Sequence, residues 1–134
     1  MAICDGHGLP LAVHVAISSP GETTLVDATL AQRFLRALPT RLIGDRGYDS
    51  DPLDRHLADR FGIELISPNR SNRRMRTQDG RPLRRYRRRW KIERLFAWFH
   101  NSRRIVTRWE RHPANFLGMI HLASAVILLR ACMR

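Results

Sequence analysis

The sequence contains little cysteine, almost no lysine and no leader-like segment. Its two cysteines, Cys4 and Cys132, lie near opposite ends of the 134 residues. No full set of cysteine and histidine ligands accompanies them, which argues against a disulfide framework and against a zinc site. The first residues do not combine a charged region with an apolar run, so we expect no secretory signal. These features favour a reducing, intracellular setting.

A long uninterrupted apolar run is also missing. The longest one, Phe116–Leu129, contains His121 and is shorter than the ~20 residues that a membrane span requires. The run therefore predicts a buried helix and no membrane association. Because 43% of the residues are hydrophobic, the chain can build the packed core of one ordinary domain.

Acidic residues are scarce in one segment. The segment from Arg70 to Arg108 contains 15 of the chain's 24 Lys and Arg residues but only two acids, Asp79 and Glu93. The rest of the chain is close to neutral. A block of this kind is often only a solvated face. Its density, the interleaved aromatic residues and the use of arginine, whose guanidinium fork suits phosphate oxygens, favour a polyanion, above all nucleic acid.

Strand-like segments alternate with helix-like segments in the first half, which predicts an α/β region. The predicted elements there are a β-hairpin over 1–17, a helix over 23–38 ended by Pro39, a strand over 40–45, a helix over 52–61 ended by Gly62, and a strand over 63–68. A polar, basic loop follows, and two helices are predicted over 83–101 and 113–131.

Several aspartates follow these predicted elements. Asp45 stands at the carboxyl end of a predicted strand, where open α/β sheets place catalytic groups, although a loop-capping role suits it equally well. Asp5 is predicted to be a turn residue. Four further aspartates are interpreted as helix-cap and surface residues: Asp49, Asp51, Asp54 and Asp59.

Glu93 is the one carboxylate within a basic, helix-like stretch. On a continuous helix Tyr86, Arg89 and Glu93 would share one stripe with Ala97 and His100. The adjacent stripe, which should face the core, consists of Ile92, Leu95, Phe96 and Phe99. An ion pair with Arg89 would explain Glu93 but not the surrounding cations.

Carboxylates flanked by phosphate-binding cations are what metal-dependent phosphoryl transfer requires. Oxygen ligands without a His and Cys cluster favour Mg²⁺. With Asp45 and Glu93 alone, such a site is one acid short.

Three segments together resemble bacterial insertion-sequence transposases of the DDE type. Tyr86, Arg89 and Glu93, separated by two and three residues, match the family's tyrosine, arginine and glutamate signature within YRRRWKIERLFAWF. LIGDRGYDSD, which contains Asp45, resembles the family's second-aspartate segment, and NFLGMIHLASAVILL resembles its C-terminal helix. The resemblance covers nearly the whole chain, and the motifs follow one another in the family's order.

The resemblance implies an α/β fold of the RNase H-like class in which Asp45 is the second catalytic acid and Glu93 the third, both as ligands of Mg²⁺ or Mn²⁺. It implies that Tyr86 and Arg89 help to position the DNA strand or the metal site. The family's signature continues to a basic residue seven positions after the glutamate, where this chain has His100. The residues expected to hold DNA are Arg70, Arg73, Arg74, Arg76, Arg84, Arg85, Arg87, Arg88, Lys91, Arg94 and His100, with Arg103 and Arg104 as substitutes for the expected basic residue.

The resemblance also implies that part of the catalytic domain lies outside these residues. The family's first aspartate lies on the first strand of the fold, upstream of the segment that CDGHGLPLAVHVAI resembles, and a helical DNA-binding region precedes it. We therefore expect the C-terminal part of a transposase, either a truncated remnant or a second reading frame joined to an upstream one by frameshifting. Within it we expect part of the sheet over 1–67, a basic loop over 68–82 and C-terminal helices over 83–134.

The function implied is cleavage and transfer of DNA strands in transposition, incomplete in this chain alone. The expected partners are transposon ends, target DNA, the upstream half of the enzyme and further copies in a homo-oligomer, in the bacterial cytoplasm at the nucleoid. Two alternatives remain. One is a non-catalytic nucleic-acid-binding module in which Glu93 only pairs with Arg89, and the other is a decayed remnant.

Overall fold

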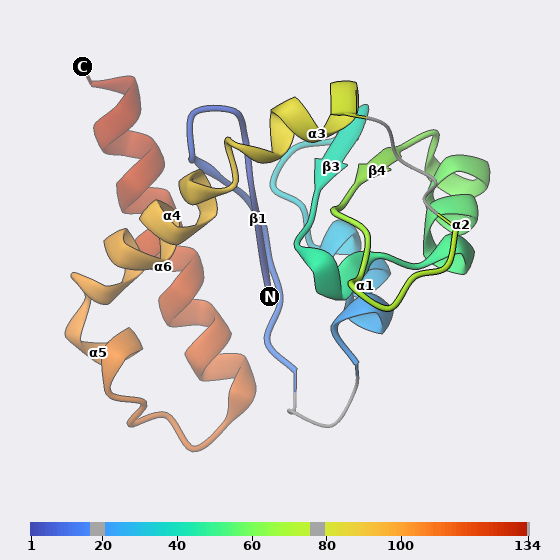
Figure 1. The fold of residues 1–134 in the computed structure, drawn as a ribbon. Helices are drawn as coiled ribbons and strands as arrows, with labels where there is room; N and C mark the ends of the chain where they lie inside the picture. The colour runs from blue at the N-terminus through green and yellow to red at the C-terminus, as the bar shows by residue number, and fades with distance from the viewer. Residues whose placement is uncertain (17–20, 76–79, 134) are drawn as a thin grey trace. The chain divides into compact units, whose positions relative to one another are not determined.

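The computed structural model describes residues 1–16, 21–75 and 80–133, which form two compact units (Figure 1). Unit 1 contains Met1–Phe34 and Trp90–Arg134, and unit 2 contains Leu35–Arg89. The N-terminal strands therefore belong with the C-terminal helices, a grouping that the sequence did not predict.

Unit 1 begins with the expected β-hairpin. β1 (Ala2–Cys4) pairs antiparallel with β2 (Pro10–Val13). The turn between them is closed by Asp5, whose Oδ1 accepts hydrogen bonds from the backbone N–H groups of His7 at 2.7 Å and Leu9 at 2.8 Å. The prediction of a turn role for Asp5 is confirmed.

The helix predicted over 23–38 is much shorter in the structure. A 3₁₀ helix, η1 (Glu22–Leu25), leads into α1 (Val26–Ala31), and the helix then ends well before Pro39. The chain beyond it runs against β2: the Phe34 N–H donates to the Leu11 carbonyl at 2.8 Å, and Arg33 forms a bridge with Ala12. Pairing with a strand has overridden helix propensity at these residues, as tertiary contacts commonly do.

Three helices complete unit 1: α4 (Trp90–His100), α5 (Arg103–Val106) and α6 (Pro113–Cys132). α4 packs on β1 and on α6 (Figure 1). The hydrophobic core between these elements consists of Val13, Leu95, Phe99, Ile120 and Ala123. Leu95 and Phe99 thus face the core as predicted, but Phe96 is 42% exposed, because α4 buries a narrower stripe than a fully surrounded helix would.

α6 is less buried than expected. Only Ile120, Ala123 and Ser124 are buried, whereas Leu122, Val126 and Leu129 are exposed. Among the described residues it is the one helix long and apolar enough, by length and composition alone, to cross a membrane. However, α6 also packs Ile120 and Ala123 into the core of unit 1, as the core helix of a folded domain does.

Unit 2 contains a strand, helix and strand in the predicted order. β3 (Arg41–Ile43) and β4 (Glu64–Ile66) pair in parallel, and between them lie the 3₁₀ helix η2 (Arg46–Tyr48) and α2 (Asp51–Phe61). α2 buries Leu53 and Leu57 and ends at Gly62, which has a φ of 66°. This left-handed conformation favours glycine and explains why the helix stops there.

The long helix predicted over 83–101 is broken. α3 (Gly80–Tyr86) ends in a turn at residues 87–89, and α4 starts afresh at Trp90. The Arg88 N–H donates to the Arg85 carbonyl at 3.0 Å and the Arg89 N–H to the Tyr86 carbonyl at 2.9 Å, so three-residue turns replace the helical ladder. The common stripe inferred for Tyr86, Arg89 and Glu93 is therefore wrong, because it required one continuous helix.

Candidate functional site

Asp45 lies directly beyond the carboxyl end of β3, as predicted. Its side-chain Oδ1 accepts a hydrogen bond from the Gly47 N–H at 2.8 Å and so caps η2. The carboxylate is half-buried, and no other hydrogen bond to it occurs among the described residues. The capping role that the sequence allowed is thus confirmed, and the catalytic role, its alternative, stays a prediction.

Glu93 lies in the first turn of α4 and is exposed, rather than at the edge of the buried face. It belongs to unit 1, whereas Asp45, Tyr86 and Arg89 belong to unit 2. Within unit 2 the Arg89 guanidinium lies over the Tyr86 ring, 5.7 Å from its centre. Two of the three signature residues therefore contact each other directly, and the third begins the next helix.

The donor set of this candidate site is chemically suited to a hard divalent cation. Asp45 and Glu93 offer carboxylate oxygens, which Mg²⁺ and Mn²⁺ prefer. No group of three or more His, Cys, Asp or Glu side chains arranged to hold a metal ion occurs in the part of the chain that the structure describes. The two acids fit such an ion by type, and no coordination geometry follows from them.

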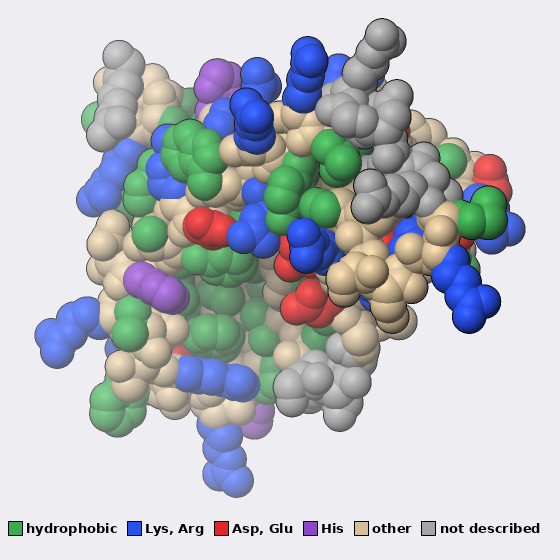
Figure 2. All heavy atoms as spheres, viewed as in Figure 1, with side chains coloured by type: hydrophobic (Ala, Val, Ile, Leu, Met, Phe, Trp, Pro, Cys, Tyr) green, Lys and Arg blue, Asp and Glu red, His purple; other side chains and the backbone are tan. Residues whose placement is uncertain are grey.

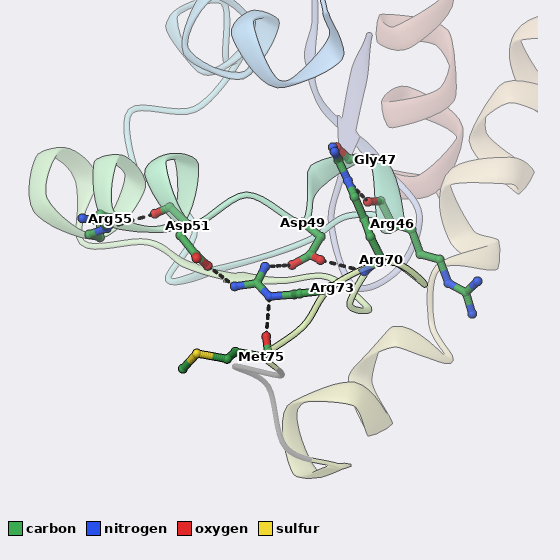
Figure 3. Close-up of polar contacts among 8 residues, drawn as sticks. All are labelled: Arg46, Gly47, Asp49, Asp51, Arg55, Arg70, Arg73 and Met75. Carbon is green, nitrogen blue, oxygen red and sulfur yellow. Dashed lines mark hydrogen bonds and ion pairs between the residues drawn. The ribbon is translucent and has the colours of Figure 1, made fainter.

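Two arginines predicted to hold DNA, Arg70 and Arg73, donate hydrogen bonds within unit 2 (Figure 3). Arg73 donates through its two terminal nitrogens to Asp49 and Asp51 and through Nε to the Met75 carbonyl at 2.8 Å. Arg70 donates through Nη2 to the Gly47 carbonyl at 2.8 Å. Both side chains bind the loop that follows Asp45.

Asp49, interpreted from the sequence as a cap or surface residue, is in fact buried, with 6% of its surface exposed. Its Oδ2 accepts a hydrogen bond from the Arg70 backbone N–H at 2.7 Å, and Oδ1 accepts from Arg73. The sequence shows an aspartate before a helix but not the partners that lie 21 and 24 residues further along. No local pattern could have identified this role.

Lys91 and Arg94 also make internal contacts. Lys91 Nζ donates to the Gly6 carbonyl and Arg94 Nη2 to the His7 carbonyl, so both hold the β1–β2 turn on α4. The Arg94 guanidinium lies 4.9 Å from the ring centres of both Trp90 and Trp98. Such stacked, hydrogen-bonded side chains stabilise unit 1 and are less available to a phosphate.

The other basic residues of the prediction point outward. On the face shown in Figure 2, Lys and Arg side chains extend into solvent at several places. Arg104 approaches Glu110 at 3.6 Å, and Arg76 lies outside the described residues. The exposed members are Arg74, Arg84, Arg85, Arg87, Arg88, His100, Arg103 and Arg104.

Comparison with known proteins identifies the family. The Transposase DDE domain family matches residues 1–128. A Burkholderia cepacia protein, named provisionally as the transposase for insertion sequence element IS402, is 38% identical over 117 residues, which are 81% of this chain and 52% of that protein. A Brucella ovis protein, named in the same provisional way for insertion sequence element IS6501, is 33% identical over 134 residues, 96% of this chain and 95% of that protein.

The chain thus spans about half the length of the first of these relatives, at 52%, and nearly all of the second, at 95%. No solved structure shows a significant match. The family implies an RNase H-like α/β fold, divalent metal ions and DNA as the partner, and the mixture of small sheets and C-terminal helices is compatible with that fold. This chain belongs to the DDE-domain transposases of bacterial insertion sequences.

Proposed function

We propose that this chain supplies two of the acids and much of the DNA-binding surface of an insertion-sequence transposase that cleaves and transfers DNA strands. The observation that carries the proposal is the placement of Asp45 at the carboxyl end of β3, with the Arg70 guanidinium bonded two residues away at the Gly47 carbonyl. This strand end is where parallel α/β sheets place their reacting groups.

Asp45 and Glu93 are the proposed ligands of Mg²⁺ or Mn²⁺. A bound ion of this type activates water and offsets the charge that develops on a scissile phosphate. Hydrolysis would release a 3′ hydroxyl at the transposon end, and that hydroxyl would attack target DNA in a second phosphoryl transfer. Tyr86 and Arg89, which lie against each other at the end of α3, would position the DNA strand beside these acids.

The exposed arginines around the break between α3 and α4 are the proposed phosphate-binding residues. Arg84, Arg85, Arg87 and Arg88 are all exposed. Arginine contacts to phosphates fix the position of a duplex without reading its sequence. Binding of this kind should be largely sequence-tolerant and should weaken steeply with salt.

The proposed set of acids needs one more member. A further aspartate, supplied from outside these residues, would complete the metal site, and the upstream half of a transposase is the proposed source. The active form is proposed to be a homo-oligomer on paired transposon ends in the bacterial cytoplasm. A DNA sequence upstream of Met1 that encodes an aspartate-bearing strand in an overlapping frame would support this part of the proposal.

Mn²⁺ binding tests the proposed metal ligands. We expect the electron paramagnetic resonance signal of free Mn²⁺ to fall when residues 1–134 are added, and expect Asp45→Asn and Glu93→Gln each to weaken that binding. Asp59→Asn, which removes an exposed carboxylate of α2, is the matched control and should leave the affinity unchanged. Equal affinity in all four proteins would contradict the assignment of Asp45 and Glu93.

A strand-cleavage assay tests the proposed incompleteness. Residues 1–134 with Mg²⁺ should bind a labelled duplex of a transposon end but cleave it poorly or not at all. Robust cleavage that survives Glu93→Gln would overturn both the role of Glu93 and the need for another acid. DNA binding without any Mn²⁺ affinity that depends on Asp45 or Glu93 would instead favour a non-catalytic binding module.

A further inference from the structure

Asp49 is the buried acid that neither the family signature nor the proposed metal site uses. Only 2% of its side chain is exposed, and both carboxylate oxygens accept hydrogen bonds. A buried carboxylate is stable only when its partners replace water, so these contacts are requirements of the fold and not incidental surface contacts.

The first partner of Asp49 is the backbone at Arg70. The Arg70 N–H donates to Oδ2 at 2.7 Å. The Arg70 side chain then extends to the 3₁₀ helix η2 and donates to the carbonyls of Arg46, at 3.2 Å, and Gly47, at 2.8 Å. Arg70 is therefore fixed at both its backbone and its guanidinium group (Figure 3).

The second partner is the guanidinium group of Arg73. Its fork spans Asp49 and Asp51, and its Nε donates to the Met75 carbonyl at 2.8 Å. All three nitrogens are thus occupied, and 14% of the side chain is exposed. Bidentate arginine contacts to carboxylates are geometrically demanding, so they hold the segments they join in one arrangement.

These contacts converge on the residue that Asp45 caps. Asp45 accepts a hydrogen bond from the Gly47 N–H, and Arg70 donates to the carbonyl of the same Gly47. The backbone at Gly47 is consequently held from both sides. Asp49 holds Arg70 and Arg73 in place, so the orientation of the Asp45 carboxylate depends on a buried acid four residues away.

We infer that Asp49 is a positioning residue of the transposase site: it fixes the 45–51 loop against the 70–75 segment and so sets the Asp45 carboxylate for metal binding. The inference rests on the proposed role of Asp45 as a metal ligand. In this role Asp49 is assigned no contact with the metal or the DNA, because only 2% of its side chain is exposed and it already accepts hydrogen bonds from Arg70 and Arg73. Arg70 and Arg73 serve the same arrangement through the hydrogen bonds of their guanidinium groups.

Hydrogen exchange tests the structural half of this inference without any metal. In Asp49→Asn, one amide cannot accept both hydrogen bonds as a carboxylate does, so the backbone amides of residues 46–49 should exchange at least about tenfold faster. The amides in the middle of α2 should keep wild-type protection. Arg73→Lys, which keeps the charge but loses the fork, is the milder second variant and should show a smaller change at the same amides. Unchanged exchange at residues 46–49 in both variants would overturn the inference.

Mn²⁺ affinity of the whole chain tests the functional half. Asp49→Asn should weaken Mn²⁺ binding roughly tenfold, and Arg73→Lys should weaken it less. Ile63→Val provides the matched control, because Ile63 is buried in the same unit, 1% exposed, and its truncation destabilises the fold at a residue outside both the 45–51 loop and the 70–75 segment. It should leave Mn²⁺ affinity unchanged.

The two proposals fail in different ways. Wild-type affinity in Asp49→Asn, together with weakened binding in Asp45→Asn, would overturn the inference and leave the proposed function standing. Absence of Mn²⁺ binding in the wild-type chain would overturn the proposed metal ligands, and the exchange of residues 46–49 would then still decide whether Asp49 fixes the loop. Equal loss of affinity in Ile63→Val and Asp49→Asn would reduce Asp49 to general stabilisation and overturn its positioning role.

Discussion

Two arginine-rich segments of unit 2 differ in what their side chains do. In the 70–75 segment, Arg70 and Arg73 donate hydrogen bonds to Asp49, to Asp51 and to backbone carbonyls of the preceding loop. In the 84–88 segment, the arginines are exposed around a helix end and a turn. Similar composition therefore accompanies internal hydrogen bonds in one segment and exposed guanidinium groups in the other.

The difference depends on where carboxylates lie in three dimensions. Asp49 and Asp51 are more than 20 residues before Arg73 but face it in the fold. The net charge of a segment shows how strongly it attracts a polyanion, whereas the available donors decide which residues can hold one. Four predictions test this comparison, from the largest expected effect to the smallest.

The largest effect should come from the exposed segment. Replacing Arg84, Arg85, Arg87 and Arg88 together by Gln removes up to four phosphate contacts, so the slope of log affinity against log salt should fall by about 3 to 4. A fluorescence titration of a random-sequence duplex from low to moderate salt measures it. The matched control for net charge compares two double variants. One replaces Arg55 and Arg60 of α2 by Gln, and the other replaces Arg87 and Arg88 by Gln. Equal losses in these two double variants would refute the distinction.

Arg73→Gln should mainly affect stability. It leaves the buried Asp49 carboxylate without its guanidinium partner, so the free energy of unfolding should fall clearly below that of the wild type. Urea denaturation measures the loss. Arg74→Gln, at the neighbouring exposed position, should stay within about 0.5 kcal/mol of the wild type. A pair of variants with equal stability would show that Arg73 is no more structural than Arg74.

The pH dependence of stability probes the acids around Arg73. Burial raises the pKa of Asp54, the charges of Asp51 and Asp49 raise it further, and Arg73 lowers it. A carboxylate with a raised folded-state pKa destabilises the fold once it is ionised, so its cost is absent at low pH and grows as pH rises through that pKa. Asp54 Oδ1 is also buried without a hydrogen-bond partner among the described residues.

Asp54→Asn should therefore be more stable than the wild type at neutral pH, and the difference should vanish as pH falls below about 4. The gain should be larger in an Arg73→Gln background, because the cation that favours ionised Asp54 is then absent. Thermal unfolding across pH 3 to 8 measures both differences. A gain of the same size at pH 3 and pH 7 would contradict the electrostatic explanation.

The smallest effect extends the comparison to unit 1, where Lys91 and Arg94 also serve structure. Burial raises the pKa of the Cys4 thiol to about 11, the charge of Asp5 also raises it, and the two cations lower it without reversing the shift. Cys4 should therefore remain a thiol at pH 8 and react slowly with iodoacetamide, while the exposed Cys132 reacts faster. Mass spectrometry of the labelled peptides distinguishes the two sites. Arg94→Ala should speed labelling of Cys4 by loosening the hairpin, and no change would show that Arg94 does not hold it.

Local patterns predicted much of the fold. The hairpin, the strand, helix and strand of unit 2, the Gly62 stop and the apolar C-terminal helix all follow from turn residues and short-range periodicity. The errors come from longer-range competition. The segment after Ala31 leaves its helix because β2 offers a backbone partner. The turn at residues 87–89 interrupts a helix that periodicity alone would continue, and no local sequence pattern explains it.

The candidate site was predictable only in part. Asp45 could be identified because strand ends are local features, whereas the burial of Asp49 depends on donors from Arg70 and Arg73 far along the chain. Likewise, Arg73 bonds to Asp49 and Arg94 stacks on Trp90 in the fold, and a count of charged residues along the sequence does not show these contacts. Sequence identifies which side chains could bind DNA, and packing decides which of them remain available.

The Asp49 contacts also have a topological consequence. They close a non-covalent ring of 21 to 24 residues that encloses α2 and β4. Closing a ring of this length costs chain entropy, which is recovered only after the enclosed helix and strand are in place, so the ring should form late in folding. Once formed, it would hold the two ends of a protease nick within residues 52–69 together. If the fragments coelute after such a cut and separate when Asp49 is replaced, the Asp49 contacts hold the two fragments of unit 2 together.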